Sequence, residues 1–211
     1  MPHKLPRGLY ALLDDSVRPL VPMIDAARAV LEAGVGVLQL RLEQTSDRVA
    51  LSLIGQVVAL ASVRGVMVIV NDRVDLALAG AAHGVHLGAD DVPVDVARRI
   101  LGPDALIGAT TRCLEDIVHA KALGADHVGL GPLFATTTKV VAHAPMGLEA
   151  FAAIASRSPL PVVGIAGITL ASIGQVAAAG AWAAAVAGDL LCADDLVSRA
   201  RALQSAFSGS R

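Results

Sequence analysis

The sequence predicts an α/β fold in which eight parallel strands, each followed by a helix, close into a single (β/α)8 barrel, the TIM barrel. Short runs of Val, Ile and Leu alternate with segments of helical pattern along the whole chain. The alternation occurs eight times, which is the number of units in such a barrel. Polar clusters follow several of the apolar runs, and parallel α/β folds bind ligands beyond the carboxyl ends of their strands.

The expected strands are short, apolar and bounded by Gly, Asp or Asn. They cover residues 8–13, 37–40, 66–70, 84–87, 106–109, 127–130, 161–165 and 183–187. The expected helices cover residues 22–33, 47–63, 73–80, 93–101, 113–123, 147–156, 170–179 and 194–207. Pro93 suits the first turn of its helix, where a missing N–H costs nothing. Ser46 and Thr169 are predicted N-caps.

A weak internal repeat supports the barrel. An Ala/Leu-Gly-Ala/Val tripeptide ends four expected helices, at residues 33–35, 79–81, 123–125 and 179–181. We expect its central Gly to be a C-cap with positive φ. An open doubly wound sheet is the alternative, but no G-x-G-x-x-G follows the first strand, which argues against a dinucleotide-binding version. No linker is visible, so we predict one domain over residues 1–211.

The composition limits the class of protein. Hydrophobic residues make up 55% of the chain and aromatic residues 2%, so the core has to be built from aliphatic side chains. The net charge is −2 without a basic stripe, which argues against nucleic-acid and membrane partners. Residues 158–188 are uncharged, but Pro and Gly interrupt them, so we expect strand, turn, helix and strand there. Cys113 and Cys192 lack metal-site spacing, and no signal peptide is evident, which predicts a cytoplasmic protein.

Two aspartates are candidate metal ligands. Asp72 and Asp91 each follow an expected strand closely, so both side chains can reach the same mouth of a barrel. Two carboxylates, completed by water and phosphate oxygens, suit Mg²⁺. The alternative is that each aspartate caps the helix that follows it.

Other polar residues at strand ends are candidate ligand contacts. Arg41 can bind a phosphate with its guanidinium fork, or can form a structural ion pair with Asp72 or Glu43. The amides of Gln39 and Asn71 can contact a ligand or loop backbone. A lone histidine such as His86 is more often a hydrogen-bonded core residue than a catalyst.

Two loops can bind anions. Residues 131–139 contain three consecutive Thr and a Lys after a strand, and they form either a phosphate loop or an ordinary solvated loop. Residues 140–146 lack a regular pattern and are a candidate lid. Residues 164–169 form a turn before a helix, and backbone N–H groups in such turns bind phosphate in many barrels.

In this order, the motifs resemble those of the thiamine-phosphate synthase family, which shares a superfamily with the thiazole tautomerases. The resemblance extends from Leu9 to about Leu203 and depends on the ordered set, since each motif alone is weak. The motifs are Gln39-Leu40-Arg41, Val70 to Ala77, Gly84 to Gly88 with Asp91, Gly129 to Phe134, Thr136 to Lys139, Pro145 to Glu149, and Gly167-Ile168-Thr169.

The resemblance implies a Mg²⁺-dependent transferase of thiamine biosynthesis that joins a hydroxymethylpyrimidine diphosphate to a thiazole phosphate and releases pyrophosphate. Asp72 and Asp91 would hold Mg²⁺. The implied pyrimidine diphosphate contacts are Gln39, Arg41, Asn71, Thr110 and Lys139, and the implied thiazole phosphate contacts are Thr136, Thr138, Gly167, Ala187 and Gly188. The chemistry is dissociative, so we expect Arg41, Asn71 and Lys139 to stabilise the leaving diphosphate rather than act as a general base. The sequence leaves open whether the chain is a homo-oligomer.

The chain departs from the family pattern at the implied site. Thr110 replaces a Ser, Ala166 replaces the first Gly of a pair, Gly188 replaces a Ser and is followed by Asp189, and Glu43 replaces a Lys. The two acids stand where the family binds phosphate, and unit charges about 4 Å apart interact by roughly 4 kcal/mol at an effective dielectric near 20. We therefore expect weakened binding unless Glu43 turns away or becomes a further Mg²⁺ ligand.

Three functions stay open on the sequence. The leading one is the synthase reaction. The second is tautomerisation of a thiazole phosphate carboxylate with His86 or Glu43 as proton carrier, although Arg112 stands near where tautomerases carry a His that would be catalytic. The third is non-catalytic binding of a phosphorylated ligand.

Overall fold

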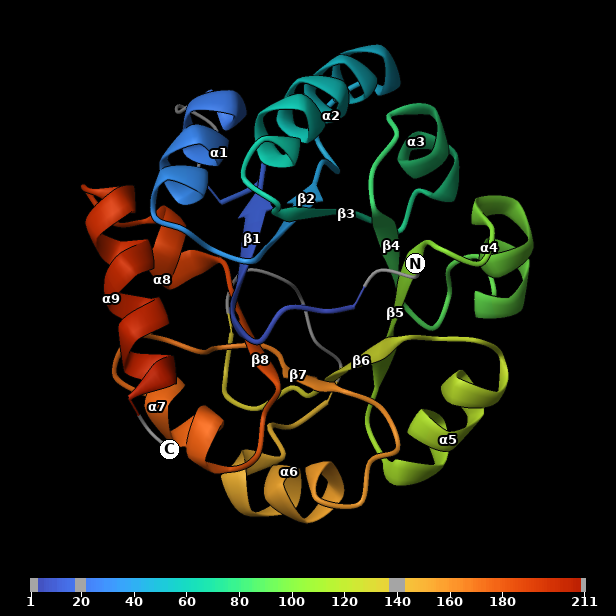
Figure 1. Ribbon diagram of the computed structural model, residues 1–211. Helices are drawn as coiled ribbons and strands as arrows, with labels where there is room; N and C mark the ends of the chain where they lie inside the picture. Colours follow the sequence, from blue (N-terminus) through green and yellow to red (C-terminus); the bar gives the residue numbers. More distant parts are fainter. Residues whose placement is uncertain (1–3, 18–21, 137–142, 210–211) are drawn as a thin grey trace.

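The chain folds into the predicted closed barrel. The structure is a computed structural model that describes residues 4–17, 22–136 and 143–209. Eight parallel strands pair in sequence order, and β8 (Ala183–Val186) pairs with β1 (Gly8–Asp14) to close the ring. Figure 1 shows the strands at the centre and the helices around them. The open doubly wound sheet is thereby excluded.

All predicted strands are present, and their ends differ from the predicted ones by at most two residues. The remaining strands are β2 (Val37–Arg41), β3 (Met67–Asn71), β4 (Gly84–Leu87), β5 (Leu106–Thr111), β6 (His127–Leu130) and β7 (Val162–Gly164). The predicted helices are α1 (Met23–Glu32), α2 (Asp47–Ser62), α3 (Val74–Ala79), α4 (Val94–Leu101), α5 (Leu114–Ala122), α6 (Gly147–Ala155), α7 (Ile173–Ala178) and α9 (Leu196–Ser208). The short helix α8 (Gly188–Leu191) was not predicted.

The N-terminal ends of the helices correct one prediction. Thr169 is not the N-cap of α7, because the helix begins at Ile173 and Ser172 is its N-cap. The Thr169 N–H donates to the Ser172 hydroxyl at 3.0 Å, and this bond forms a turn ahead of the helix. Ser46 and Pro93 occupy the N-cap positions of α2 and α4, one residue before each helix, and the Ser46 side chain makes no capping bond.

The repeated glycines have the predicted positive φ at three of four positions, but there each follows the C-cap residue instead of being the C-cap itself. Gly34, Gly124 and Gly180 have φ values of 81°, 99° and 95°. Gly80 has a φ of −86°, and the next residue, Ala81, takes the left-handed conformation instead, at 53°. The tripeptide therefore marks each helix end correctly, but in the second repeat the turn comes one residue later.

Side chains alternate along each strand and fill two apolar layers. Leu9, Ala11 and Leu13 of β1 belong to the large layer between the barrel and its helices. Tyr10 belongs to a second cluster, which fills the inside of the barrel. That inner cluster contains Leu5, Tyr10, Val37, Ile69, Leu106, Val163 and Ala183.

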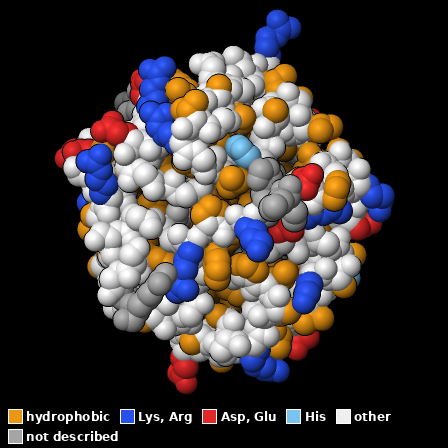
Figure 2. Space-filling model, viewed as in Figure 1, with side chains coloured by type: hydrophobic (Ala, Val, Ile, Leu, Met, Phe, Trp, Pro, Cys, Tyr) orange, Lys and Arg blue, Asp and Glu red, His pale blue; other side chains and the backbone are white. Residues whose placement is uncertain are grey.

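The described surface carries mixed charge, and the uncharged segment contains several elements. On the face shown in Figure 2, acidic and basic side chains are interspersed with apolar ones. Residues 158–188 contain β7, α7 and β8, separated by turns, as expected. Within the described ranges, no helix combines the length and the hydropathy that a bilayer crossing requires.

Candidate active site

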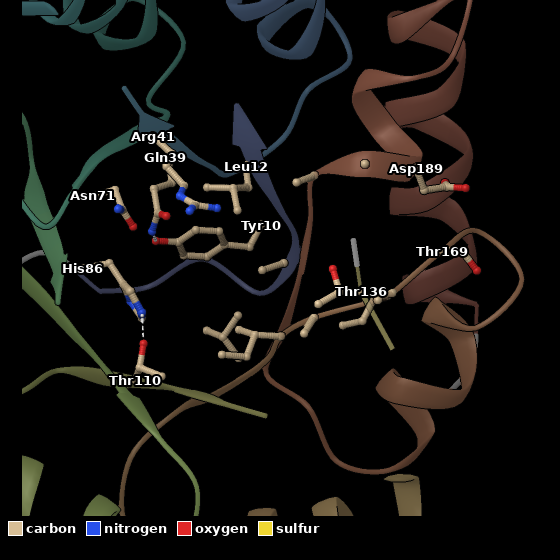
Figure 3. A pocket seen from close by; sticks show the side chains of 18 of the residues that line it. Tyr10, Leu12, Gln39, Arg41, Asn71, His86, Thr110, Thr136, Thr169 and Asp189 are labelled. Atoms are coloured by element: carbon tan, nitrogen blue, oxygen red, sulfur yellow. Dashed lines mark hydrogen bonds between the residues drawn. The ribbon is translucent and has the colours of Figure 1, made fainter. Parts of the chain in front are cut away.

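A cavity of about 530 Å³ opens at the carboxyl ends of the strands. Its polar walls continue the inner layer of the barrel, because side chains two residues apart on a strand point the same way. On β2, for example, Val37 lies in the inner cluster, and Gln39 and Arg41 follow it into the cavity. Figure 3 shows the Gln39 amide pointing toward the Tyr10 hydroxyl, with the Arg41 guanidinium above the Tyr10 ring.

Most of the predicted ligand contacts line this cavity. They are Gln39, Arg41, Asn71, Thr110, Thr136, Gly167, Ala187 and Gly188. Glu43, Asp72 and Asp91 are described but do not belong to the lining. Thr138, Lys139 and the first part of the candidate lid lie outside the described residues. The fold thus brings together the described contacts from both halves of the predicted site.

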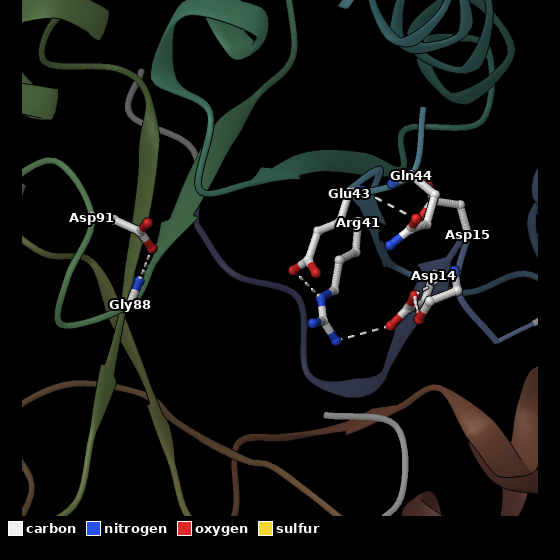
Figure 4. A network of polar contacts seen from close by, with 8 residues as sticks. Asp14, Asp15, Arg41, Glu43, Gln44, Gly88 and Asp91 are labelled. Atoms are coloured by element: carbon white, nitrogen blue, oxygen red, sulfur yellow. Dashed lines mark hydrogen bonds and ion pairs between the residues drawn. The ribbon is translucent and has the colours of Figure 1, made fainter. Parts of the chain in front are cut away.

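Arg41 lies between two carboxylates. Its side chain is 9% exposed, and NH1 donates to Asp14 Oδ2 at 2.9 Å while Nε donates to Glu43 Oε1 at 2.8 Å (Figure 4). Burial alone lowers the pKa of Arg41, but the hydrogen bond to Glu43 and the charges of Asp14, Glu43 and Asp72 outweigh it and raise the pKa. The ion pair with Glu43 was foreseen as an alternative, whereas the pair with Asp14 was not.

The loop after β2 keeps Glu43 close to Arg41. Asp15 Oδ1 accepts from the Glu43 N–H at 3.2 Å, and Oδ2 accepts from the Gln44 N–H at 2.9 Å and from Thr45 Oγ1 at 2.8 Å. These bonds join the end of β1 to the loop that follows β2. The position of Glu43 is therefore fixed by the local backbone, and its carboxylate turns toward the guanidinium.

The two candidate metal ligands do not cap helices. The N-cap of α3 is Arg73 and that of α4 is Pro93, and neither helix has a side-chain capping bond. Asp72 has a φ of 60°, its N–H donates to the His86 carbonyl at 2.8 Å, and its charge contributes to the raised pKa of Arg41. Asp91 Oδ2 accepts from the Gly88 N–H at 2.6 Å. The helix-capping alternative is wrong for both residues.

Polar side chains also line the deep end of the cavity. Gln39 Nε2 donates to the Tyr10 hydroxyl at 2.8 Å, and burial raises the pKa of Tyr10. His86 Nε2 and Thr110 Oγ1 lie 3.0 Å apart, so His86 is hydrogen-bonded, as expected of a core histidine. His127 is fully buried, and this burial, reinforced by His86, lowers the pKa of His127 to about 3.

Tyr10 and His127 were not among the predicted site residues. Both line the cavity. The signal that could have found them is strand parity. Tyr10 is one of the alternate residues of the first strand that point into the barrel. His127 lies two residues before Gly129, at the start of a strand that ends beside the predicted phosphate loop.

The opposite wall contains the predicted phosphate turn. Ala166 and Gly167 both have left-handed backbone, with φ values of 73° and 67°. A Cβ on Gly167 would collide with the Ala135 carbonyl oxygen, so glycine is required there. Ala166 tolerates the same backbone with a methyl group, at the position where the family pattern has glycine.

Asp189 on the same wall is paired. Its Oδ2 accepts from Arg199 of α9 at 2.9 Å and from the Leu170 N–H at 3.2 Å, and its side chain is 17% exposed. In Figure 3 the carboxylate points away from the Tyr10 side of the cavity. The expected repulsion of phosphate by Asp189 is therefore offset by a neighbouring cation that the sequence motifs did not reveal.

Comparison with known proteins fixes the family. The family model of thiamine monophosphate synthase matches residues 9–190. The chain belongs to this family. Over 210 residues it is 50% identical to the thiamine-phosphate synthase of Myxococcus xanthus, which covers 100% of this chain and 96% of that protein. It is 47% identical over 204 residues to the thiamine-phosphate synthase of Anaeromyxobacter dehalogenans, covering 97% of this chain and 89% of that protein.

A solved structure agrees with this assignment. The thiamine phosphate pyrophosphorylase of Pyrococcus furiosus superposes with a TM-score of 0.86 at 30% identity, covering 96% of each chain. The structural match and the family match thus both cover nearly the whole barrel. Of the three functions left open by the sequence, the names of these relatives support the transferase.

Proposed function

We propose that the chain joins a hydroxymethylpyrimidine diphosphate to a thiazole phosphate, forming thiamine phosphate and releasing pyrophosphate. The observation that carries the proposal is the 50% identity, over the full chain, to a thiamine-phosphate synthase. The cavity supports it, because cationic, amide and hydroxyl groups lie on one wall and a tight glycine turn on the other. We expect each wall to bind one of the two phosphorylated substrates.

The reaction breaks the bond between the pyrimidine methylene carbon and the diphosphate, and forms a bond from that carbon to the thiazole nitrogen. Negative charge grows on the leaving diphosphate, so groups that stabilise it lower the barrier. Arg41 supplies a buried cation, and Asn71 and Thr110 supply neutral hydrogen-bonding groups elsewhere in the cavity lining. Lys139 would add a second cation, as the family resemblance implies.

Asp72 and Asp91 are the residues that we expect to hold Mg²⁺. Within the described ranges, no group of three or more His, Cys, Asp and Glu is arranged to hold a metal ion. Mg²⁺ fits this donor set, since it commonly takes one or two carboxylates and fills its shell with water and substrate phosphates. When bound, the ion supplies further positive charge to the departing diphosphate.

Pyrophosphate release tests the proposed reaction. Protein incubated with both substrates and MgCl₂ should release pyrophosphate, and chelation of the metal by EDTA should abolish the release. Asp91→Asn should raise the Mg²⁺ concentration needed for half-maximal rate, whereas Asp95→Asn, an exposed residue of α4, should not. Turnover that persists in EDTA would remove the metal from the mechanism.

Adjacent threonines on β5 provide a matched pair of variants. Thr110 faces the cavity, whereas Thr111 is buried and donates to the Gly129 carbonyl at 3.2 Å. Thr110→Val should lower kcat/KM by about tenfold or more, because it removes a hydrogen bond to a charged ligand. Thr111→Val should leave kcat/KM nearly unchanged. Ligand-induced thermal stabilisation without turnover in the wild type would instead indicate a binding protein.

A further inference from the structure

His127 is a buried histidine that the mechanism above does not use. It lies on β6, is fully buried and lines the deep end of the cavity. Neither ring nitrogen has a hydrogen-bond partner in the described part of the chain. Such buried polar atoms are uncommon in folded proteins and call for a specific explanation.

The ring of His127 faces His86 across a glycine. A Cβ on Gly108 would lie 2.5 Å from His86 Nδ1 and closer still to His127 Nε2, so the missing side chain lets these two nitrogens approach each other. The two ring centroids are 5.9 Å apart, with the ring planes tilted by 37°. On its other edge, His86 Nε2 lies 3.0 Å from Thr110 Oγ1 (Figure 3). The three side chains therefore form a row from the barrel interior to the cavity.

The positions of the protons in this row follow from simple bookkeeping of donors and acceptors. Burial keeps His127 neutral, so it has one N–H and one lone pair. A buried N–H without an acceptor is rarer than a buried acceptor without a donor. The proton therefore belongs on Nε2, which faces His86, and Nδ1 keeps the lone pair.

The rest of the row is then determined. His86 Nδ1 then accepts from His127 through one bridging water, since the two nitrogens make no direct hydrogen bond, and as a neutral ring His86 must carry its own proton on Nε2. That N–H donates to Thr110 Oγ1. The Thr110 hydroxyl hydrogen is left to be donated to a ligand in the cavity. The reverse order would end in a lone pair facing the ligand, which a phosphate oxygen would repel.

We propose that His127 is a positioning residue that acts through His86 to direct the Thr110 hydroxyl as a donor toward the diphosphate of the bound substrate. The inference rests on the proposed function, because it takes the ligand at Thr110 to be a diphosphate. It assigns to His127, at the deep end of the cavity, a part in substrate affinity that is exerted through His86 and Thr110.

The histidine tautomers give a test that does not need turnover. Long-range ¹H–¹⁵N NMR spectra of protein labelled at histidine report which ring nitrogen carries the proton. We expect His86 to be protonated on Nε2 in the wild type. In His127→Phe, His86 should become a mixture of tautomers, whereas His127→Gln, whose amide keeps an N–H near the former Nε2, should preserve the Nε2 form. A wild-type His86 protonated on Nδ1 would overturn the proposal.

Binding of inorganic pyrophosphate with MgCl₂, measured by calorimetry, gives the second test. His127→Phe should weaken binding by about tenfold, the scale of one hydrogen bond to a charged group, and His127→Gln should restore most of it. His119→Phe, on the exposed side of α5, is the control and should bind normally. Wild-type protein that does not bind pyrophosphate would also overturn the proposal.

A double-mutant cycle separates positioning from a general structural effect. In a Thr110→Val background, His127→Phe should cause no further loss of pyrophosphate affinity, because the end of the row is already missing. Independent losses in the two variants would overturn the proposal. If His127→Phe fails to fold, the proposal is still tested by the tautomer of His86 in the wild type and by the tautomer and pyrophosphate affinity of His127→Gln. Absence of turnover with both substrates would disprove the proposed reaction and leave the tautomer and pyrophosphate results standing.

Discussion

The carboxylate of Glu43 accepts a hydrogen bond from Nε of Arg41 at 2.8 Å. The guanidinium that should bind the diphosphate is therefore partly occupied by an acid from its own strand end. Asp14 accepts a second hydrogen bond, from NH1 of the same guanidinium. A ligand that reaches Arg41 has to share it with these carboxylates or displace Glu43, which is the more exposed of the two.

Glu43→Gln should tighten substrate binding. The amide keeps a hydrogen-bond acceptor for Arg41 but removes the negative charge that a diphosphate meets. Because the Glu43 side chain is 43% exposed, solvent screens the gain, and we expect KM for the pyrimidine diphosphate to fall by only about two- to fivefold. Glu32→Gln, which changes an exposed acid on α1, is the control for net charge. An unchanged or higher KM would show that the Glu43 charge does not oppose binding.

Arg199 should protect the thiazole phosphate from Asp189. Arg199→Met removes the cation that pairs with Asp189 and leaves an uncompensated acid on the cavity wall. We expect KM for the thiazole phosphate to rise several-fold while KM for the pyrimidine diphosphate stays nearly constant. Adding Asp189→Asn should reverse the effect. If the double variant is no better than Arg199→Met, the cation has another role.

Ala166→Gly should stabilise the fold. An L-residue in the left-handed region costs roughly 1–2 kcal/mol, whereas the extra unfolded-state freedom of Gly costs about 0.5–1 kcal/mol. We therefore expect the free energy of unfolding to rise by up to about 1.5 kcal/mol in urea titrations. Ala152→Gly, in the right-handed backbone of α6, should lower it by about 1 kcal/mol. A loss of stability in Ala166→Gly would mean that its methyl group packs favourably enough to offset the backbone strain.

His127 should make the fold sensitive to acid. Its pKa is lowered from 6.5 to about 3 by burial and by the neighbouring His86. Below pH 6.5 the unfolded chain takes up a proton that the folded chain refuses, so stability falls as the pH drops toward 3. The loss from this residue approaches about 1.4 kcal/mol per pH unit. His127→Phe should lose less stability than the wild type between about pH 6.5 and pH 4.5, measured by urea unfolding. Parallel curves for the two proteins would contradict a buried neutral His127.

The fold was predictable because the strand pattern, the helix pattern and the turn residues all indicated the same eight units. Aliphatic runs predicted the strands, and the repeated glycines marked four helix ends. Helix α8 was missed because four residues show no period, and the start of α7 was missed because the bond between Thr169 and Ser172 competes with the helix.

The candidate site was predictable where ligand-facing residues follow a strand in sequence. Gln39, Arg41, Asn71 and Thr110 all line the cavity. The compensating contacts were not predictable, because each joins residues distant in the chain. Asp14 meets Arg41 across neighbouring strands, and Arg199 approaches Asp189 from the last helix. Pairings of this kind depend on register and helix placement rather than on local pattern.

Gly108 couples the choice of residue on three neighbouring strands. With histidines at 86 and 127, even a methyl group at 108 would displace both rings. The residue at each of these three positions is therefore constrained by the other two. During evolution, only some combinations of side chains at the three positions fit together. Attempts to redesign this protein for bulkier substrates should vary positions 86, 108 and 127 jointly, since any side chain added at 108 alone would collide with both histidines.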